Sequence, residues 1–227
     1  MSAAQLADIA GLLADRTRAE VCVCLLDGRA WTAGALARAA GVAASTMSEH
    51  LSRLTTAGLL TERRQGRHRY VELAGGAVAD TLETLLALTE PRPQARTLRA
   101  VAATEAVIRA RTCYDHLAGQ LGVAVTEAMS SRGLLGDNLA VTAPGRDWLA
   151  AELGFEPGAG RRPLSRACLD WTERRSHLAG AAGAHVCATF LARGWVARVG
   201  TGRAVRVTRS GERALGELLG LDVAALG

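Results

Sequence analysis

Residues 41–73 read GVAASTMSEHLSRLTTAGLLTERRQGRHRYVEL, and this stretch decides the fold of the N-terminal part of the chain. Its first half repeats large apolar residues at helical spacing: Met47, Leu51 and Leu54. This spacing predicts an amphipathic helix with one apolar stripe. We expect Ser45 or Thr46 to cap the start of the helix, and Gly58 to end it with a left-handed cap.

The second half of the stretch predicts a basic β-hairpin, called the wing below. Two short strand-like runs, 59–64 and 68–73, flank Gln65-Gly66, and Gly66 tolerates the positive φ that a tight turn needs. Basic side chains crowd this hairpin: Arg63, Arg64, Arg67, His68 and Arg69. A cluster of this kind suits the phosphate backbone of a nucleic acid.

A shorter helix is expected immediately upstream, over residues 33–40, with Thr32 as its cap and Gly41-Val42 as the turn that follows. Helix, turn, helix and basic hairpin is the order of elements in a winged helix-turn-helix DNA-binding domain. The outward face of the second helix offers polar groups to base edges and phosphates: Ser45, Thr46, Ser48, Glu49, His50 and Arg53. The wing arginines are expected to contact the backbone or the minor groove. For His50, packing between helices is an equally good interpretation.

Residues 32–73 resemble the DNA-binding core of the arsenic-repressor (ArsR-type) family of winged-helix regulators. The matching residues are Ser45, Thr46, Ser48, His50, Leu51, Leu54, Ala57, Gly58, Leu59, Arg63, Gly66, Arg67 and Tyr70. The resemblance covers residues 5 to 90 and implies a homodimeric transcriptional regulator, usually a repressor that an effector releases from its operator in double-stranded DNA. In this family the first helix commonly pairs with the helix after the wing to form the dimer interface. Here amphipathic helices are expected at 3–14 and 77–89, with a further helix from Asp15 to about Leu26.

The composition is compatible with this interpretation. The chain has 227 residues and a formal net charge of +5. Five cysteines without a secretory signal indicate a reduced, cytoplasmic protein. No apolar run approaches the length of a membrane span, so we expect no membrane partner.

Two prolines, Pro91 and Pro93, mark the expected domain boundary, because they disfavour helix on both sides. We predict a DNA-binding and dimerisation domain over residues 1–90 and a second domain over 94–227. The fold class is mainly α with small β-hairpin wings. A helix from Gln94 to about Ala110 is expected to continue into the next motif.

The second domain repeats itself in two degenerate copies, at about 94–157 and 161–227. Motifs of the first copy recur in the second: RTCYD at 111–115 as RACLD at 166–170, HLAG at 116–119 as HLAG at 177–180, and VTAPGRDWL at 141–149 as the looser VTRSGERAL at 207–215. We expect each copy to run helix, helix, short strand or hairpin, helix, which is a winged-helix-like order. The second copy has a plain hairpin over 195–207. Repeats of this kind usually share one core.

The repeated cysteines and histidines are the candidate effector or metal site: Cys113, Asp115, His116, Cys168 and His177. On a helix, Cys113 and His116 would share a face and form half of a site for a metal or metalloid ion, completed by Cys168 or His177. Because residues 171–176 are inserted between Cys168 and His177, the second copy is not expected to place its pair in the same way.

Two other interpretations of this cluster remain open. One is a purely structural repeat, in which Arg111 with Asp115 and Arg166 with Asp170 form pairs four residues apart on helices. The other is a small-molecule pocket lined by three aromatic residues: Trp148, Trp171 and Tyr114. Cys22 and Cys24 point to opposite sides of a helix and are interpreted as apolar side chains.

The metal sites known in the ArsR-type family are not expected here. The helix at 33–40 has no cysteine, and the helix at 77–89 has acidic residues but no histidine. We predict no enzyme activity, because no oxyanion loop, phosphate loop or dinucleotide fingerprint accompanies the cysteines. The alternative functions are a cysteine-dependent redox or catalytic domain fused to a DNA-binding module, and an architectural DNA-binding protein without an effector.

Overall fold

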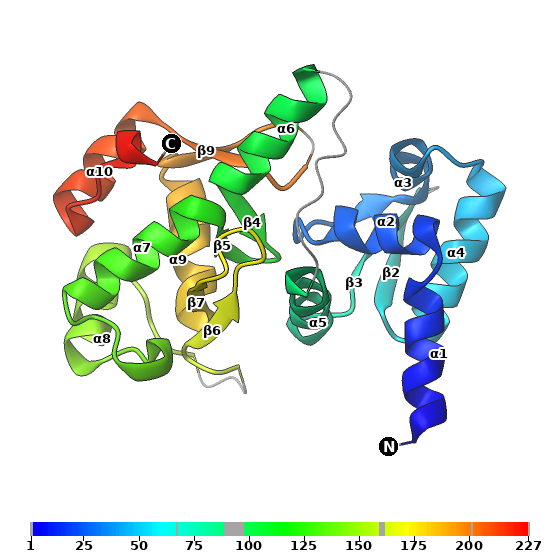
Figure 1. Cartoon of the computed structure of the whole chain (residues 1–227), viewed down its shortest axis with the longest axis horizontal. Helices are drawn as coiled ribbons and strands as arrows, with labels where there is room; N and C mark the ends of the chain where they lie inside the picture. Colours follow the sequence, from blue (N-terminus) through cyan, green and yellow to red (C-terminus); the bar gives the residue numbers. More distant parts are fainter. Residues whose placement is uncertain (1, 67, 89–97, 159–161, 201, 227) are drawn as a thin grey trace. The chain divides into compact units, whose positions relative to one another are not determined.

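The structure, a computed structural model, describes residues 2–66, 68–88, 98–158, 162–200 and 202–226 (Figure 1). The chain divides into two compact units, Met1–Leu82 and Glu83–Gly227. The boundary predicted at the two prolines lies outside the described residues. Among the helices that the structure describes, none combines the length and the apolarity needed to span a bilayer.

The first unit has the predicted winged helix-turn-helix order. Its elements are α1 (Ala3–Leu13), α2 (Arg16–Leu25), β1 (Trp31–Thr32), α3 (Ala33–Ala40), α4 (Ala44–Thr56), β2 (Leu60–Gln65), β3 (His68–Leu73) and α5 (Gly76–Ala87), which continues beyond the unit boundary. The wing is the antiparallel pair β2–β3, in which Gln65 faces His68 across a tight turn at Gly66, whose φ is 59°. The short strand β1 was not predicted; it adds a third strand beside β3.

Local capping chemistry explains where most of these helices start. The side chain of Asp15 accepts a hydrogen bond from Arg18 N at 2.9 Å at the start of α2, and that of Thr32 accepts one from Ala35 N at 3.2 Å at the start of α3. For α4 the predicted cap is wrong. The helix begins earlier, at Ala44, its cap is Ala43, and no side chain makes a capping bond. Ser45 and Thr46 therefore lie in the first turn, where they are exposed.

The apolar stripe of α4 forms the core of the first unit, as its spacing predicts. Met47, Leu51 and Leu54 are all fully buried. They are joined by buried side chains from α2, α3 and the wing: Val21, Cys22, Leu25, Leu26, Leu36, Leu60, Val71 and Leu73. Burying the stripe leaves the opposite, polar face of α4 in solvent, and this arrangement positions the candidate DNA-binding residues.

The second unit consists of helices and short hairpins. Its elements are α6 (Leu98–Arg109), β4 (Arg111–Cys113), β5 (His116–Ala118), α7 (Gly119–Ser131), η1 (Asp137–Leu139), α8 (Ala143–Leu153), β6 (Arg166–Leu169), β7 (Ser176–Ala179), α9 (Gly180–Ala192), β8 (Val196–Arg198), β9 (Val205–Val207), α10 (Arg209–Leu219) and η2 (Val223–Ala225). The predicted hairpin over 195–207 is present as β8–β9.

One expectation about this unit is wrong. Residues 111–116 and 166–177 do not continue a helix but form the hairpins β4–β5 and β6–β7. Tyr114, with a φ of 58°, turns the chain between β4 and β5 in a conformation that a helix excludes. From Arg111 and from Arg166 onward, each copied segment therefore runs hairpin and then helix, and α6 precedes the hairpin of the first copy.

The two copied segments have matching details after their hairpins. The helices α7 and α9 each have 13 residues, and α8 and α10 each have 11. Thr142 and Thr208 cap α8 and α10 in the same way, each accepting a hydrogen bond at 3.1 Å from the backbone N–H three residues later. Both threonine hydroxyls also donate to a glycine carbonyl at 2.7 Å. The sequence similarity between the copies thus corresponds to a similarity of local structure.

One hydrophobic core contains side chains from both copied segments. It includes Leu117, Leu121, Val125, Met129, Leu149 and Leu153 from the first, and Leu178, Val186, Phe190, Val196, Leu215 and Leu219 from the second. A buried hydrogen bond from Leu178 N to Thr126 Oγ1, 2.9 Å long, joins β7 to α7. Because the segments share a core, their hairpins β4–β5 and β6–β7 are held beside each other (Figure 1).

Candidate DNA-binding surface and metal centre

The polar face of α4 is open to solvent. Its exposed residues are Ser45, Thr46, Ser48, Glu49, Ser52 and Arg53. Hydroxyls and a guanidinium on one helix face can donate to base edges and phosphates. His50 behaves differently, because its Nδ1 lies 3.7 Å from Asp15 Oδ1 and its side chain is only 16% exposed. This location corresponds to the helix-packing interpretation of His50.

The wing carries three types of arginine environment. Arg64 is exposed, and it faces Arg69 across the hairpin. Arg63 lies over the ring of Tyr70, 5.9 Å from its centroid. Arg69 is ion-paired with Glu62, so its charge is partly compensated. His68 is exposed at the start of β3, and Arg67 lies outside the described residues.

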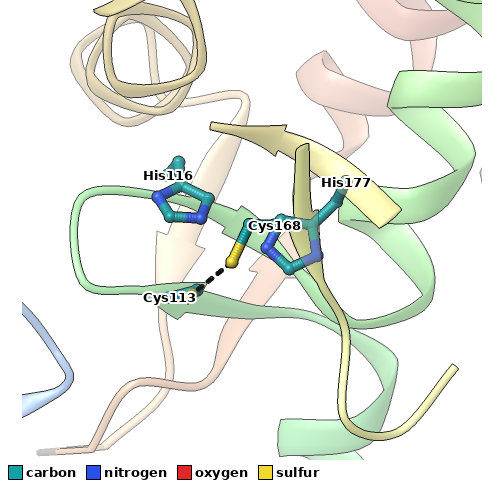
Figure 2. A group of neighbouring side chains, drawn as sticks. All are labelled: Cys113, His116, Cys168 and His177. Atoms are coloured by element: carbon teal, nitrogen blue, oxygen red, sulfur yellow. Dashed lines mark hydrogen bonds between the residues drawn. The ribbon is translucent and has the colours of Figure 1, made fainter. Parts of the chain in front are cut away.

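The second candidate site joins two hairpins of the second unit. Cys113 faces His116 across β4–β5, and Cys168 faces His177 across β6–β7. The inserted residues therefore lengthen the β6–β7 hairpin, in which Leu169 pairs with Ser176, and they do not disturb the pairing of Cys168 with His177, contrary to the expectation from the sequence. Figure 2 shows the four side chains directed into one space between the hairpins. Their candidate ligand atoms all lie within 4.8 Å of one another, and the two sulfurs are 3.9 Å apart.

All four side chains are buried, with exposed fractions of 1% for Cys113, 2% for His116, 7% for Cys168 and 1% for His177. The two imidazole rings are 5.1 Å apart, centroid to centroid. The Nε2 atoms of both histidines have no hydrogen-bond partner among the described residues. Buried polar atoms usually have a hydrogen-bond partner, so these two nitrogen atoms indicate that the site binds a ligand.

A carboxylate lies beside each histidine. Nδ1 of His116 is 3.2 Å from Asp115 Oδ1, and Nδ1 of His177 is 3.3 Å from Asp170 Oδ2. Arg162 holds Asp115 with two hydrogen bonds, 2.6 and 3.0 Å long. The carboxylate of Asp115 can therefore hold the ring of His116 by a hydrogen bond, whereas Nδ1 of His177, although close to Asp170, has no hydrogen-bond partner among the described residues.

Asp170 is the most strongly held of these groups, and its role was not predicted. The carboxylate accepts hydrogen bonds from Arg111 Nη2 at 2.8 Å, from Gly119 N at 2.7 Å and from Thr172 Oγ1 at 2.6 Å. Both Arg111 and Asp170 are fully buried. The expected pairs Arg111–Asp115 and Arg166–Asp170 are thus wrong, because the strands separate these residues and Arg111 pairs across the copies.

The surroundings shift the acidity of the cluster. The hydrogen bond from Cys113 and the nearby histidines lower the pKa of the Cys168 thiol, whereas the same hydrogen bond and burial raise the pKa of Cys113. Burial opposes the charged form of His116, but Asp115 and Cys168 outweigh it and raise its pKa to about 9. The pKa of His177 is raised as well, because Asp170 outweighs burial. A cation entering this site would displace these protons.

The other residues considered for a site lie elsewhere. Cys22 is buried in the core of the first unit, and burial raises its pKa to about 11. Trp171 stacks on Arg111, 4.8 Å from ring centroid to guanidinium carbon, whereas Trp148 packs against the main core. Tyr114 belongs to the β4–β5 turn.

Comparisons with known proteins concern the whole chain and its N-terminal part. A family model described as a helix-turn-helix domain matches residues 13–63. Over 224 residues, the chain is 36% identical to the uncharacterized HTH-type transcriptional regulator YdfF of Bacillus subtilis (strain 168), covering 96% of this chain and 98% of that protein.

Solved structures match a smaller part of the chain. The winged helix-turn-helix domain of Mb0332 from Mycobacterium bovis, a possible ArsR-family regulator, is 30% identical over 37% of this chain and 77% of that chain, with a TM-score of 0.34. The cadmium sensor CMTR from Mycobacterium tuberculosis is 33% identical over 40% of this chain and 99% of that chain, with a TM-score of 0.32.

Proposed function

The chain belongs to the HTH-type transcriptional regulators, and from this premise we propose that it is a homodimeric repressor of the ArsR type, released from its operator by an effector. The observation that carries the proposal is the polar, solvent-exposed face of α4 next to the basic wing. In this mechanism α4 enters the major groove, while Arg63 and Arg64 contact phosphates beside it. The effector acts through the second unit.

Replacing the wing arginines tests the DNA-binding surface. In Arg63→Ala/Arg64→Ala, a dimer loses four candidate phosphate contacts, so the slope of log K against log salt should fall in magnitude by about 4. Binding to the chain's own upstream DNA and to random duplex DNA should weaken together. The measurement is fluorescence anisotropy at several salt concentrations.

A matched control is Arg146→Ala/Arg213→Ala, which removes the same charge from exposed positions of the second unit. A wing variant with the same salt slope as this control would contradict the wing's role.

The variant Arg53→Ala tests whether Arg53 contacts a base in the groove or only the phosphate backbone. If Arg53 contacts a base, the variant should weaken binding to the operator by about 1–3 kcal/mol and should weaken binding to random duplex DNA by less.

Exposed apolar side chains on α1 and α5 support the homodimer. Leu6 and Ile9 on α1 are 72% and 43% exposed, Leu85 on α5 is 44% exposed, and Leu88, directly after α5, is 79% exposed. Large apolar side chains that are exposed to solvent are candidates for an interaction surface. A dimer through these helices would present two copies of α4 to half-sites about 34 Å apart.

Charges placed on α1 test the dimer. Leu6→Glu/Ile9→Glu should shift the protein from dimer to monomer in sedimentation velocity at micromolar concentration, because burying a carboxylate in an apolar interface costs several kcal/mol. Val199→Glu, at a position 38% exposed in the second unit, is the control and should remain dimeric. Dimers of equal stability in both variants would exclude α1 from the interface.

The two buried cysteines, Cys113 and Cys168, suggest which chemical classes of effector to test. A metal or metalloid ion, or a thiol oxidant, would act at Cys113 and Cys168, whereas an organic ligand would leave both thiols unchanged. Adding Zn²⁺, Cd²⁺, arsenite or an oxidant to the protein–DNA complex while counting thiols discriminates these classes. Release of DNA by none of them would contradict a thiol-based effector.

A further inference from the structure

We propose that Cys113, His116, Cys168 and His177 bind one Zn²⁺-type ion, with both Sγ and both Nε2 atoms as a tetrahedral ligand set. The site lies within the second unit and does not depend on the proposed DNA-binding function. It ties the hairpin of one copied segment to the hairpin of the other.

The spacing of the ligand atoms fits this ion. A tetrahedral centre with Zn–S bonds of about 2.3 Å places its two sulfurs about 3.8 Å apart. The two sulfurs here are 3.9 Å apart. Since all four ligand atoms already lie within 4.8 Å of one another, small side-chain rotations are enough to complete the geometry.

The histidines are oriented for coordination. In both, Nδ1 lies beside a carboxylate, at 3.2 Å for His116 and 3.3 Å for His177. With the proton on Nδ1, which a neighbouring carboxylate favours, each Nε2 would offer its lone pair to a metal ion. Both Nε2 atoms are buried without a hydrogen-bond partner in the described part of the chain, which is costly unless a cation takes the lone pair.

The charges of the filled site balance. Two thiolates neutralise a divalent cation, and neutral imidazoles add no charge. The two neighbouring carboxylates are paired with arginines, Asp115 with Arg162 and Asp170 with Arg111. The buried centre is therefore neutral with the ion bound, as a site away from water requires.

The ligand types select the metal. Hard cations such as Mg²⁺ and Ca²⁺ prefer oxygen ligands, and Cu²⁺ prefers tetragonal geometry, whereas two thiolates and two imidazoles suit Zn²⁺, Cd²⁺ and Co²⁺. The four ligands are buried and leave no open position. This arrangement is typical of a structural zinc site, in which binding stabilises the fold.

Metal analysis of the full-length, reduced protein tests the proposal. We expect one equivalent of Zn²⁺ per chain by mass spectrometry, and, after chelation and refilling with Co²⁺, the intense visible bands of tetrahedral cobalt with sulfur-to-cobalt charge transfer. Cys113 and Cys168 should react with a thiol reagent only after chelation. Cys22 and Cys187 stay protected in either state, because burial raises their pKa values to about 11 and about 12.

Single-residue variants test which side chains bind the ion and whether the carboxylate beside His116 contributes to binding. Cys113→Ser should abolish the tetrahedral cobalt spectrum, and Cys24→Ala, outside the cluster, should leave it unchanged. Asp115→Asn keeps the side-chain shape and should weaken Co²⁺ binding by about 10- to 100-fold, which makes it informative even if the ligand variant fails to fold.

Two results would overturn the proposal. One is an octahedral cobalt spectrum of the wild-type protein, which signifies surface binding only. The other is substoichiometric metal with both thiols freely reactive in the reduced wild type. Because these readouts use free protein, they succeed or fail independently of operator binding, which is measured separately with and without the ion.

Discussion

Asp170→Ala is expected to destabilise the second unit by about 3–5 kcal/mol, because it leaves the buried guanidinium of Arg111 without its carboxylate. Asp170 and Arg111 both have 0% exposed side chains, and their contact is 2.8 Å long. The same substitution frees Gly119 N, which donates to Asp170 Oδ2 at 2.7 Å. An uncompensated buried charge costs more than the pair itself contributes, so the effect exceeds that of an exposed ion pair.

Urea denaturation measures this effect. In a Trp31→Phe background the three remaining tryptophans, Trp148, Trp171 and Trp195, all report on the second unit. A chelator is included so that bound metal does not contribute to stability. The unfolding midpoint of Asp170→Ala should fall by about 1–2 M.

The matched control is Asp115→Ala. Asp115 is also paired with an arginine, but its side chain is 30% exposed and that of Arg162 is 45% exposed, so its loss should cost about 1 kcal/mol or less. Arg111→Met/Asp170→Ala removes both buried charges and should recover much of the lost stability. Equal midpoints for the two single aspartate variants would show that the buried pair is not the source of the effect.

Gly211→Ala is expected to destabilise the second unit by about 3 kcal/mol or more. A Cβ at Gly211 would lie 2.0 Å from the carbonyl oxygen of Trp195 and 2.9 Å from Val207 Cγ1. The first contact is with backbone, which cannot rotate away as a side chain can. Relief therefore requires α10 to move off the hairpin β8–β9.

The same helix supplies the control for this prediction. A Cβ at Gly216 would find its nearest neighbour at 3.9 Å, and Gly216 is exposed. Gly216→Ala should therefore stabilise the unit by about 0.5–1 kcal/mol through helix propensity. Both variants are measured by the same urea titration. Equal stability of Gly211→Ala and Gly216→Ala would show that α10 does not pack closely against the carbonyl of Trp195.

The equivalent glycine of the other copied segment gives an independent test. A Cβ at Gly145 would also lie 2.0 Å from a carbonyl oxygen, that of Leu134. Gly145→Ala should match Gly211→Ala in sign and approximate size. A large difference between them would mean that the two segments pack their second helices differently.

Most of the first unit could be predicted from the sequence, because its elements depend on local patterns. Met47, Leu51 and Leu54 specify one face of a helix, Gly66 permits the turn of the wing, and Asp15 and Thr32 cap their helices in the structure. The strand β1 escaped prediction, since two residues carry no period of their own and pair only where β3 is already present.

The repeat in the sequence identified the cysteines and histidines of the second unit but assigned them the wrong local structure. Strands of three or four residues are too short for an alternating pattern to be recognised, so the segment before Tyr114 resembled the end of α6. The burial of all three residues of β4 depends on distant parts of the chain, because Arg111 contacts Asp170, Thr112 N donates to the carbonyl of Arg203, and Cys113 contacts Cys168.

The sequence by itself determined the helix-turn-helix, the basic wing and the residue types of the candidate metal site, because each depends on neighbours within a few positions. Only the tertiary structure decided that Cys113 and His116 meet Cys168 and His177, and that Arg111 holds Asp170 beside His177. The physical reason is that neither copied segment buries its apolar side chains alone. Packing both around one core brings together side chains that are more than 50 residues apart in the chain.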